Sequence, residues 1–393
     1  MLWFGTAISQ STVTNDQLQV GNVFATQQLD VVTADSDTTA TTTATGNSFT
    51  GSVNTGDVDV QSNQTTLGTT QAQTTVNVDS NAGEFTTMTT AATANTGQSV
   101  ISGGGTLSGN YTQTSAGPLV DGESQLNAPN AQTGDIAESV QAIANSQGYG
   151  ATDSNISTST TQVNSSTVMA NGGAILGDVV EQGSFIAIGT GNNVNSDGAG
   201  NTSQDLAVNQ TNNADVTQGA MFVNLGNSQI TNTSATSTGN NMSATNTQGS
   251  LNAGVSQDNE SYVRAQSVET SFAFGGANVS AYGVGNSVLA ANIGPSVGLN
   301  NVQVNGTGGV ESIASFQGDN GYDAFVASTA VGNAATAFSC SSCGGVMSVR
   351  NSQTNNGDAA ATASVGLTSG ARSVRSTATA AGNTGTFYVT SPN

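Results

Sequence analysis

The feature that most constrains this chain is an amide residue that recurs about every 48 positions. Successive members of the series lie 47 to 49 residues apart over seven consecutive steps. A fixed period of this length predicts a repeat architecture of about eight units. The members are Gln17, Gln64, Gln113, Gln162, Gln210, Gln257, Asn305 and Gln353, with asparagine substituting in the seventh unit.

A second marker lies between these amides, and it is a glycine followed by asparagine or glutamine. Only the third unit departs from it, with Gly148 followed by tyrosine. Glycine tolerates a positive φ, so we expect these positions to form turns between successive strands. The glycines are Gly46, Gly97, Gly191, Gly239, Gly285, Gly332 and Gly382.

The segments around both markers alternate small or apolar residues with polar ones, as in residues 271–274 and 374–380. A period of two is typical of strands with one buried face. Thr and Val are abundant, which favours extended structure. The chain has only 12 Phe, 6 Tyr and 1 Trp in 393 residues, so it cannot fill the thick core of a conventional globular domain.

These observations predict an all-β fold, an elongated β-solenoid of about eight repeats of about 48 residues. Each coil pairs with its neighbours, and equivalent Asn and Gln side chains stack into ladders. Whether a unit forms one coil or two stays open from the sequence. A β-sandwich of stacked hairpins is the alternative architecture.

Residues 1–7 are the most apolar heptad and end in a small-x-small pattern, so we interpret them as the remnant of a signal peptide. Residues 8–393 are then expected to form a single repeat domain. Cys340 and Cys343 are the only thiols, and in an exported protein we expect them to form a local disulfide. An exported, extracellular protein follows from this interpretation.

The charge is strongly one-sided, with 25 acidic and 4 basic residues and a net charge of −21. The basic residues are Arg264, Arg350, Arg372 and Arg375. Such a chain repels phosphate backbones, so nucleic-acid binding is not expected. A cationic or neutral partner fits better. No apolar run reaches the length of a transmembrane helix.

The absence of His and Lys excludes Ser-His-Asp, Cys-His and Schiff-base catalysis. We therefore expect neither an enzyme nor a cofactor. Paired carboxylates such as Asp121 and Glu123 leave a tailspike-like glycan hydrolase as an alternative. The best local candidate for Ca²⁺ is the segment that contains Asp319 and Asp323, although it matches no established calcium loop.

The repeated amide-marked β units, the Gly-Asn steps and the closing segment 386–390 resemble the holdfast anchor protein HfaD family of stalked alphaproteobacteria. The resemblance implies a structural adhesin on the outer membrane that fastens an adhesive polysaccharide to the cell. It also implies export through a curli-type lipoprotein pore, and no catalytic residues. The net charge suggests a cationic amino-sugar polymer as the polysaccharide. A phage tail fibre and a curli-like amyloid subunit are the alternative functions.

Overall fold

The structure, a computed structural model, describes residues 10–340 and 345–390. Strands make up nearly all of these two ranges, and they contain no helix. Accordingly, no helix long and apolar enough to cross a membrane is found in them. The predicted all-β class is confirmed.

The strands form two parallel sheets. The first sheet contains short strands, which are β1 (Ser11–Gln19), β4 (Val58–Thr66), β6 (Thr106–Ser115), β8 (Asn155–Asn164), β10 (Gln204–Asn212), β12 (Ser250–Asn259), β14 (Ser296–Asn305) and β16 (Val346–Asn355). The second contains mostly long strands, which are β2 (Val23–Thr33), β3 (Asp37–Val53), β5 (Thr70–Ser102), β7 (Leu119–Thr152), β9 (Thr167–Ala199), β11 (Val216–Asn246), β13 (Tyr262–Asn292), β15 (Val310–Cys340), β17 (Ala359–Leu367) and β18 (Ser373–Thr390).

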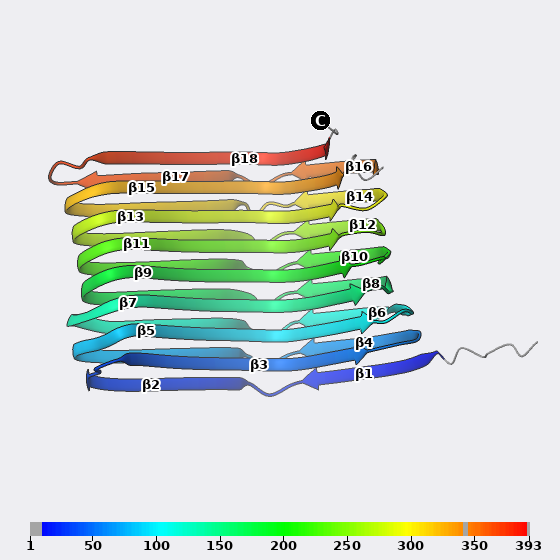
Figure 1. Ribbon diagram of the computed structural model, residues 1–393, viewed down its shortest axis with the longest axis horizontal. Helices are drawn as coiled ribbons and strands as arrows, with labels where there is room; N and C mark the ends of the chain where they lie inside the picture. Colours follow the sequence, from blue (N-terminus) through cyan, green and yellow to red (C-terminus); the bar gives the residue numbers. More distant parts are fainter. Residues whose placement is uncertain (1–9, 341–344, 391–393) are drawn as a thin grey trace, which may run out of the picture.

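Each unit of about 48 residues forms one coil of a solenoid. Gln17 on β1 pairs in register with Gln64 on β4, one unit later, and the same offset relates Asn47 on β3 to Asn95 on β5. The coils are stacked one above another in chain order (Figure 1). The solenoid prediction is therefore confirmed, and the open question of one or two coils per unit is answered by one.

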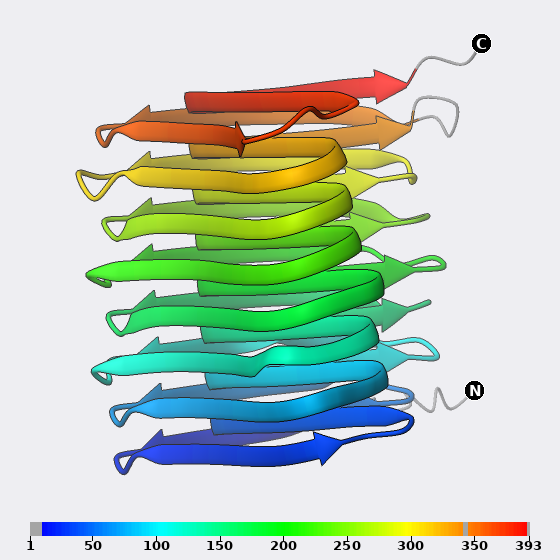
Figure 2. The same cartoon turned by 90° about the vertical axis from the view of Figure 1, so that its left-hand side faces the viewer.

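Each coil runs in two layers. In the first coil β1 and β2 form the first layer, and β3 returns beside them as the second layer. From the second coil to the seventh, one long strand joins the two layers: residues 70–78 of β5 pair with β2, and residues 85–101 pair with β3. Figure 2 shows these long strands turning back on themselves at one side of the stack.

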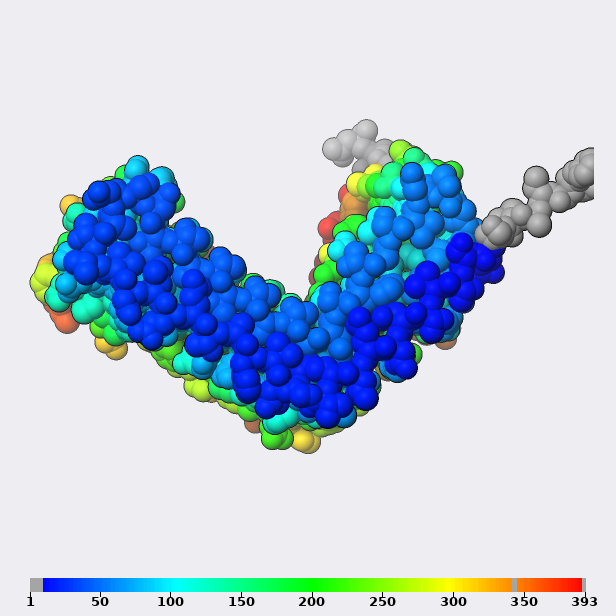
Figure 3. All heavy atoms as spheres, turned by 90° about the horizontal axis from the view of Figure 1, so that it is seen from below, coloured from blue at the N-terminus to red at the C-terminus, as the bar shows by residue number. Residues whose placement is uncertain are grey.

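Seen along the stack, the two layers are bent into a V with two arms (Figure 3). We call the arm with the short strands of the first sheet the right arm, and the arm where the long strands turn back the left arm, as in Figure 1. The short and long strands of the first layer are separated by a break, as at residues 20–22 between β1 and β2. The bend lies at this break.

The core is thin, and the inward side chains alternate with outward ones along every strand. The right arm buries residues such as Leu107, Ile156 and Leu251. The left arm buries alanines together with Leu126 and Phe185. Each of the two layers contributes only its inward side chains to the core, so the space between the layers is narrow. Small residues fill it, as the composition predicts.

Candidate functional site

A ladder of glutamines runs through all eight coils beside the bend. In each step the Nε2 atom donates to the Oε1 atom of the glutamine one coil earlier, over 2.7–2.9 Å. The members are Gln17, Gln64, Gln113, Gln162, Gln210, Gln257, Gln303 and Gln353.

A ladder of asparagines faces it from the second layer. Here each Nδ2 atom donates to the Oδ1 atom of the asparagine one coil later, over 2.8–2.9 Å. The two ladders therefore point in opposite directions along the stack. The members are Asn47, Asn95, Asn145, Asn192, Asn240, Asn286, Asn333 and Asn383.

These amides also join the two layers of each coil. Gln210 is 1% exposed and donates its second N–H to the backbone oxygen of Asn241, over 2.8 Å. Asn240 is fully buried and donates to the backbone oxygen of Asp258 in the other layer, also over 2.8 Å. Buried amides are tolerated only when hydrogen-bonded, and here both N–H groups are used. The recurring amides thus have a structural role.

The sequence prediction was wrong for one member of the glutamine series. Gln257 pairs with Gln303 and not with Asn305, and Gln303 pairs with Gln353. Asn305 belongs to a separate ladder, between Asn259 and Asn355. The reason is that the two adjoining units are 46 and 50 residues long, so a constant period points two residues too far.

The glycines of the second marker differ from the prediction as well. They lie inside the long strands and not in turns, and none has a positive φ. Their role is to allow close approach at the bend: a Cβ atom on Gly239 would lie 2.3 Å from the Oδ1 atom of Asn259 and 2.5 Å from the backbone oxygen of Gly285. Positive φ occurs elsewhere, for example at Gly56 and Gly200 at the right tip and at Gly83, where β5 turns between the layers.

Gly97 does not belong to the same structural position as the other glycines. The neighbours of Gly46 align with those of Ala94, so Ala94 is its equivalent in the second coil. In the third coil the equivalent is Ala144. Gly97 lies three residues further along the strand. This explains why more residues separate it from Gln64 than separate the glycine from the glutamine in most units.

Sequence analysis missed two carboxyl groups inside the left arm. Glu269 is fully buried and accepts hydrogen bonds from the hydroxyls of Thr231 and Thr233, over 2.5 and 2.6 Å. Burial raises its pKa to about 7, against the effect of these hydroxyls. Glu138 is 1% exposed, and burial raises its pKa to about 8. The alternation from buried Ala265 would have placed Glu269 inward.

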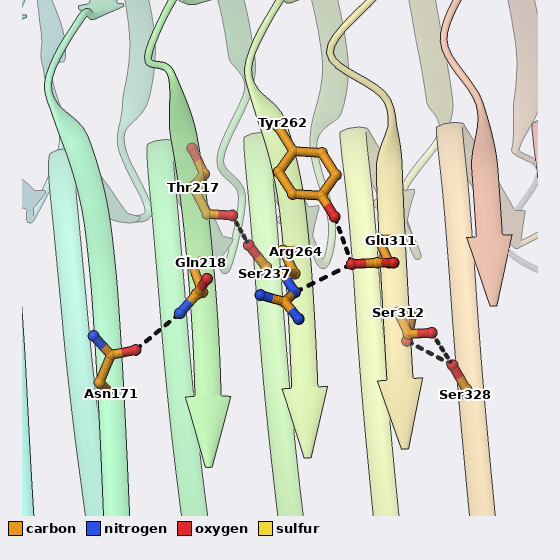
Figure 4. Close-up of polar contacts among 9 residues, drawn as sticks. All are labelled: Asn171, Thr217, Gln218, Ser237, Tyr262, Arg264, Glu311, Ser312 and Ser328. Carbon is orange, nitrogen blue, oxygen red and sulfur yellow. Dashed lines mark hydrogen bonds and ion pairs between the residues drawn. The ribbon is translucent and has the colours of Figure 1, made fainter. Parts of the chain in front are cut away.

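The one arginine outside the last coil is neutralised locally. The Nε atom of Arg264 lies 3.1 Å from the Oε2 atom of Glu311, to which the Tyr262 hydroxyl also donates, over 2.5 Å (Figure 4). Burial, followed by the contact with Glu311, raises the pKa of Tyr262 to about 12. The first seven coils therefore present an almost purely anionic surface.

The two carboxylates of the calcium candidate do not converge. Asp319 accepts a hydrogen bond from Thr368, whereas Asp323 forms an ion pair with Arg372, which lowers the pKa of Asp323. Within residues 10–340 and 345–390, no group of three or more His, Cys, Asp or Glu side chains is placed to hold a metal ion.

The cysteines and the N-terminal segment are only partly covered. Cys340 ends β15, is 8% exposed and is not a free thiol. Cys343 and the predicted signal-peptide remnant, residues 1–7, lie outside the described residues.

Three adjoining cavities follow the left arm. A cavity of 320 Å³ is lined by Phe222, and one of 550 Å³ by Phe272, and both include Asn224 and Thr270. The third, of 710 Å³, continues around the tip from the residue after Phe272 and includes Tyr322. We call the surface of these three neighbouring cavities, which includes Phe222, Asn224, Thr270, Phe272 and Tyr322, the aromatic groove.

The three aromatic residues of the groove come from alternate strands of successive coils. Phe222, Phe272 and Tyr322 lie on β11, β13 and β15 and are 46%, 60% and 64% exposed. By register, Phe272 stands four residues further along its strand than Phe222, and Tyr322 three residues further again, at the tip. They therefore form a diagonal row. Because they are about 50 residues apart in the chain, only the register reveals it. The Arg372 guanidinium lies over one face of the Tyr322 ring, 5.8 Å from its centroid.

Polar groups accompany this row. The amide of Asn224 accepts a hydrogen bond from Thr270 over 2.8 Å, and the carboxylates of Asp319 and Asp178 line the two larger cavities. Exposed rings suit the apolar faces of sugars, while amides, hydroxyls and carboxylates suit their hydroxyl and amino groups. The groove thus combines apolar ring faces with hydrogen-bonding and acidic groups.

A family model described as Holdfast attachment protein D matches residues 32–309, which is more than half of the chain. A search of characterised proteins found no significant match, and neither did a search of solved structures. The expected resemblance is confirmed, and the chain belongs to the holdfast attachment protein D family, whose members are associated with the cell surface.

Proposed function

We propose that this protein anchors an adhesive holdfast polysaccharide to the outer-membrane surface, and that it does so by binding and not by catalysis. The family supports the attachment role. The observation that carries the proposal is the aromatic groove, where Phe222, Phe272 and Tyr322 form a diagonal row beside amide and carboxylate groups. Export through a curli-type lipoprotein pore is part of the proposal.

The polymer that fits best is a partly deacetylated amino-sugar chain. The protein has a net charge of −21, and Arg264, the only cation of the first seven coils, is paired with Glu311. Free amines on such a polymer would be attracted by this field and would meet Asp178 and Asp319 in the groove. Acetylated sugars would stack on the rings.

The test is a titration of the full chain with a soluble, partly deacetylated chitin oligosaccharide, followed by calorimetry. Phe272→Ala and Tyr322→Ala should each weaken binding about three- to tenfold, because each removes a stacking surface. Phe24→Ala is the matched control, since Phe24 is also 60% exposed but lies on β2, outside the groove. Equal losses in all three variants would show that the groove is not the binding site.

Ionic strength tests the electrostatic half of the proposal. Affinity for the partly deacetylated oligosaccharide should fall as salt is raised, whereas affinity for the fully acetylated one should change little. An affinity for the cationic polymer that is indifferent to salt would contradict the role given to the protein's charge.

A further inference from the structure

The two ends of the solenoid have matching edges. At one end the strands are β1, β2 and β3, of 9, 11 and 17 residues. At the other they are β16, β17 and β18, of 10, 9 and 18 residues. Within the described part of the chain, each of these six strands is paired on one side only.

We propose that the β1–β3 edge of one copy of this chain stacks on the β16–β18 edge of a second copy, head to tail and in the register that relates successive coils. A strand edge with free N–H and C=O groups pairs readily with another chain. Three independent observations identify the occupant as a second copy: the direction of the ladders, the apolar rows and the charges of the terminal coils.

The ladders would continue across such a junction. Gln353 uses its Nε2 atom for Gln303 and the backbone of Thr384, which leaves its Oε1 atom as an acceptor at the end of the stack. At the opposite end Gln17 has one N–H donated to Ser48 and a second available. A stacked copy therefore places a donor on an acceptor, as in every internal step.

The asparagine ladder gives the same result with the opposite direction. The Oδ1 atom of Asn383 accepts from Asn333, so its Nδ2 atom faces the open end. Asn47 donates to Asn95 and presents its Oδ1 atom at the other end. Head-to-tail stacking matches both ladders at once, whereas joining two identical ends would place acceptor on acceptor in one ladder and donor on donor in the other.

Two inward rows of the left arm, which are apolar at both of their ends, would also become continuous. By register, Leu29 and Val31 on β2 occupy the same two rows as Val365 and Leu367 on β17. All four are only partly buried in the single chain. Stacking would cover them and bury apolar area at both edges.

The terminal coils carry opposite charge in a chain that is otherwise anionic. The first coil, residues 10–53, contains the four acids Asp16, Asp30, Asp35 and Asp37 and no basic residue. The last coil, residues 346–390, contains three arginines and one aspartate. The repulsion expected between two copies of net charge −21 is therefore replaced by attraction at this junction.

The register places two arginines beside two aspartates across the junction. Arg350 in the last coil occupies the register position of Thr14 in the first coil. In a stacked second copy it would therefore lie against Thr14, next to Asp16 on the same face. Arg375 continues the row of Thr39, next to Asp37. Both arginines are exposed, and neither has an ion pair with another described residue.

The experiment measures assembly of the full chain by sedimentation velocity over a range of concentrations. The wild type should form a series of multiples of the monomer. One variant makes the β16–β18 edge acidic, by Arg350→Glu with Arg375→Glu. The other makes the β1–β3 edge basic, by Asp16→Arg with Asp37→Arg. Each variant alone should associate at least about tenfold more weakly than the wild type. An equimolar mixture of the two variants should assemble again, because each junction then joins opposite charges.

The mixture also serves as the folding control, since misfolded variants would not regain assembly on mixing. A wild type that stays monomeric at every concentration would overturn the proposal. So would single variants that assemble as well as the wild type, or a mixture that assembles no better than its components.

Discussion

Glu138 and Glu269 are buried in the left arm of a chain whose surface is already strongly anionic. A charged carboxylate is costly in such a place, because the solvation it had in water is lost. Burial therefore raises the pKa of both groups, and they fold as neutral acids at low pH. This makes the stability of the left arm sensitive to pH.

The free energy of unfolding should fall as pH rises from about 4.5 to about 8. The ordinary pKa of these glutamates is 4.5, and the folded values are about 8 for Glu138 and about 7 for Glu269. Between these limits the unfolded chain has released the protons that the folded chain holds, so each rise in pH favours unfolding. Below about pH 4.5 the stabilisation is fully present. Urea denaturation at a series of pH values measures the slope.

The double variant Glu138→Gln with Glu269→Gln should flatten this slope, since an amide does not titrate. Glu84→Gln is the control, because Glu84 is an exposed carboxylate on β5. A double variant that keeps the slope of the wild type would contradict the assignment to these two groups.

At the scale of the element, each short strand of the first sheet carries one inward glutamine of the ladder. Gln210 on β10 contacts the glutamines of both neighbouring coils and the backbone of the second layer. Its neighbour Asn209 points outward and is exposed. Adjacent residues of similar chemistry thus have different structural roles.

Gln210→Ala should lower the free energy of unfolding by about 1–3 kcal/mol, because it leaves buried hydrogen-bonding groups without partners. Asn209→Ala should change it by no more than about 0.5 kcal/mol, as usual for surface positions. Chemical denaturation of the two variants measures the difference. Similar effects at both positions would mean that the ladder contributes nothing beyond strand propensity.

The sequence predicts the ladder well and its surroundings less well. The glutamine spacing identified seven of the eight members, because a buried amide has few substitutes. It selected Asn305 instead of Gln303, since changes in the length of the connections between strands alter the unit length without changing the stack. The glycines were recognised, but their close contacts could not be, because the atoms that meet Gly239 belong to residues 20 and 46 positions later. The aromatic groove depends on three-dimensional register, so no local pattern predicted it.

At the scale of the whole molecule, each coil contacts mainly the coil before and the coil after it. The stability of such a stack is approximately a sum of coil and junction contributions. One coil can then be removed if the register of the cut ends agrees.

Deletion of residues 210–256, which joins Asn209 to Gln257, should leave a folded solenoid one coil shorter, because Gln210 and Gln257 are equivalent positions. Small-angle X-ray scattering should show a stack shortened by about 4.8 Å, the spacing of paired strands. Deletion of residues 210–233, about half a unit, should prevent the remaining strands from pairing in register. Equal folding of both variants would contradict the coil as the unit of stability.

The bend at the ladders has a mechanical consequence for a protein of a cell-attachment family. A flat slab of two thin layers flexes easily across its thickness. Folding the same slab lengthwise into a V, as Figure 3 shows, places material away from the neutral plane, so the stack resists flexing in every direction, as an angle beam does. The buried amides beside the bend keep the two arms at a fixed angle from the first coil to the last.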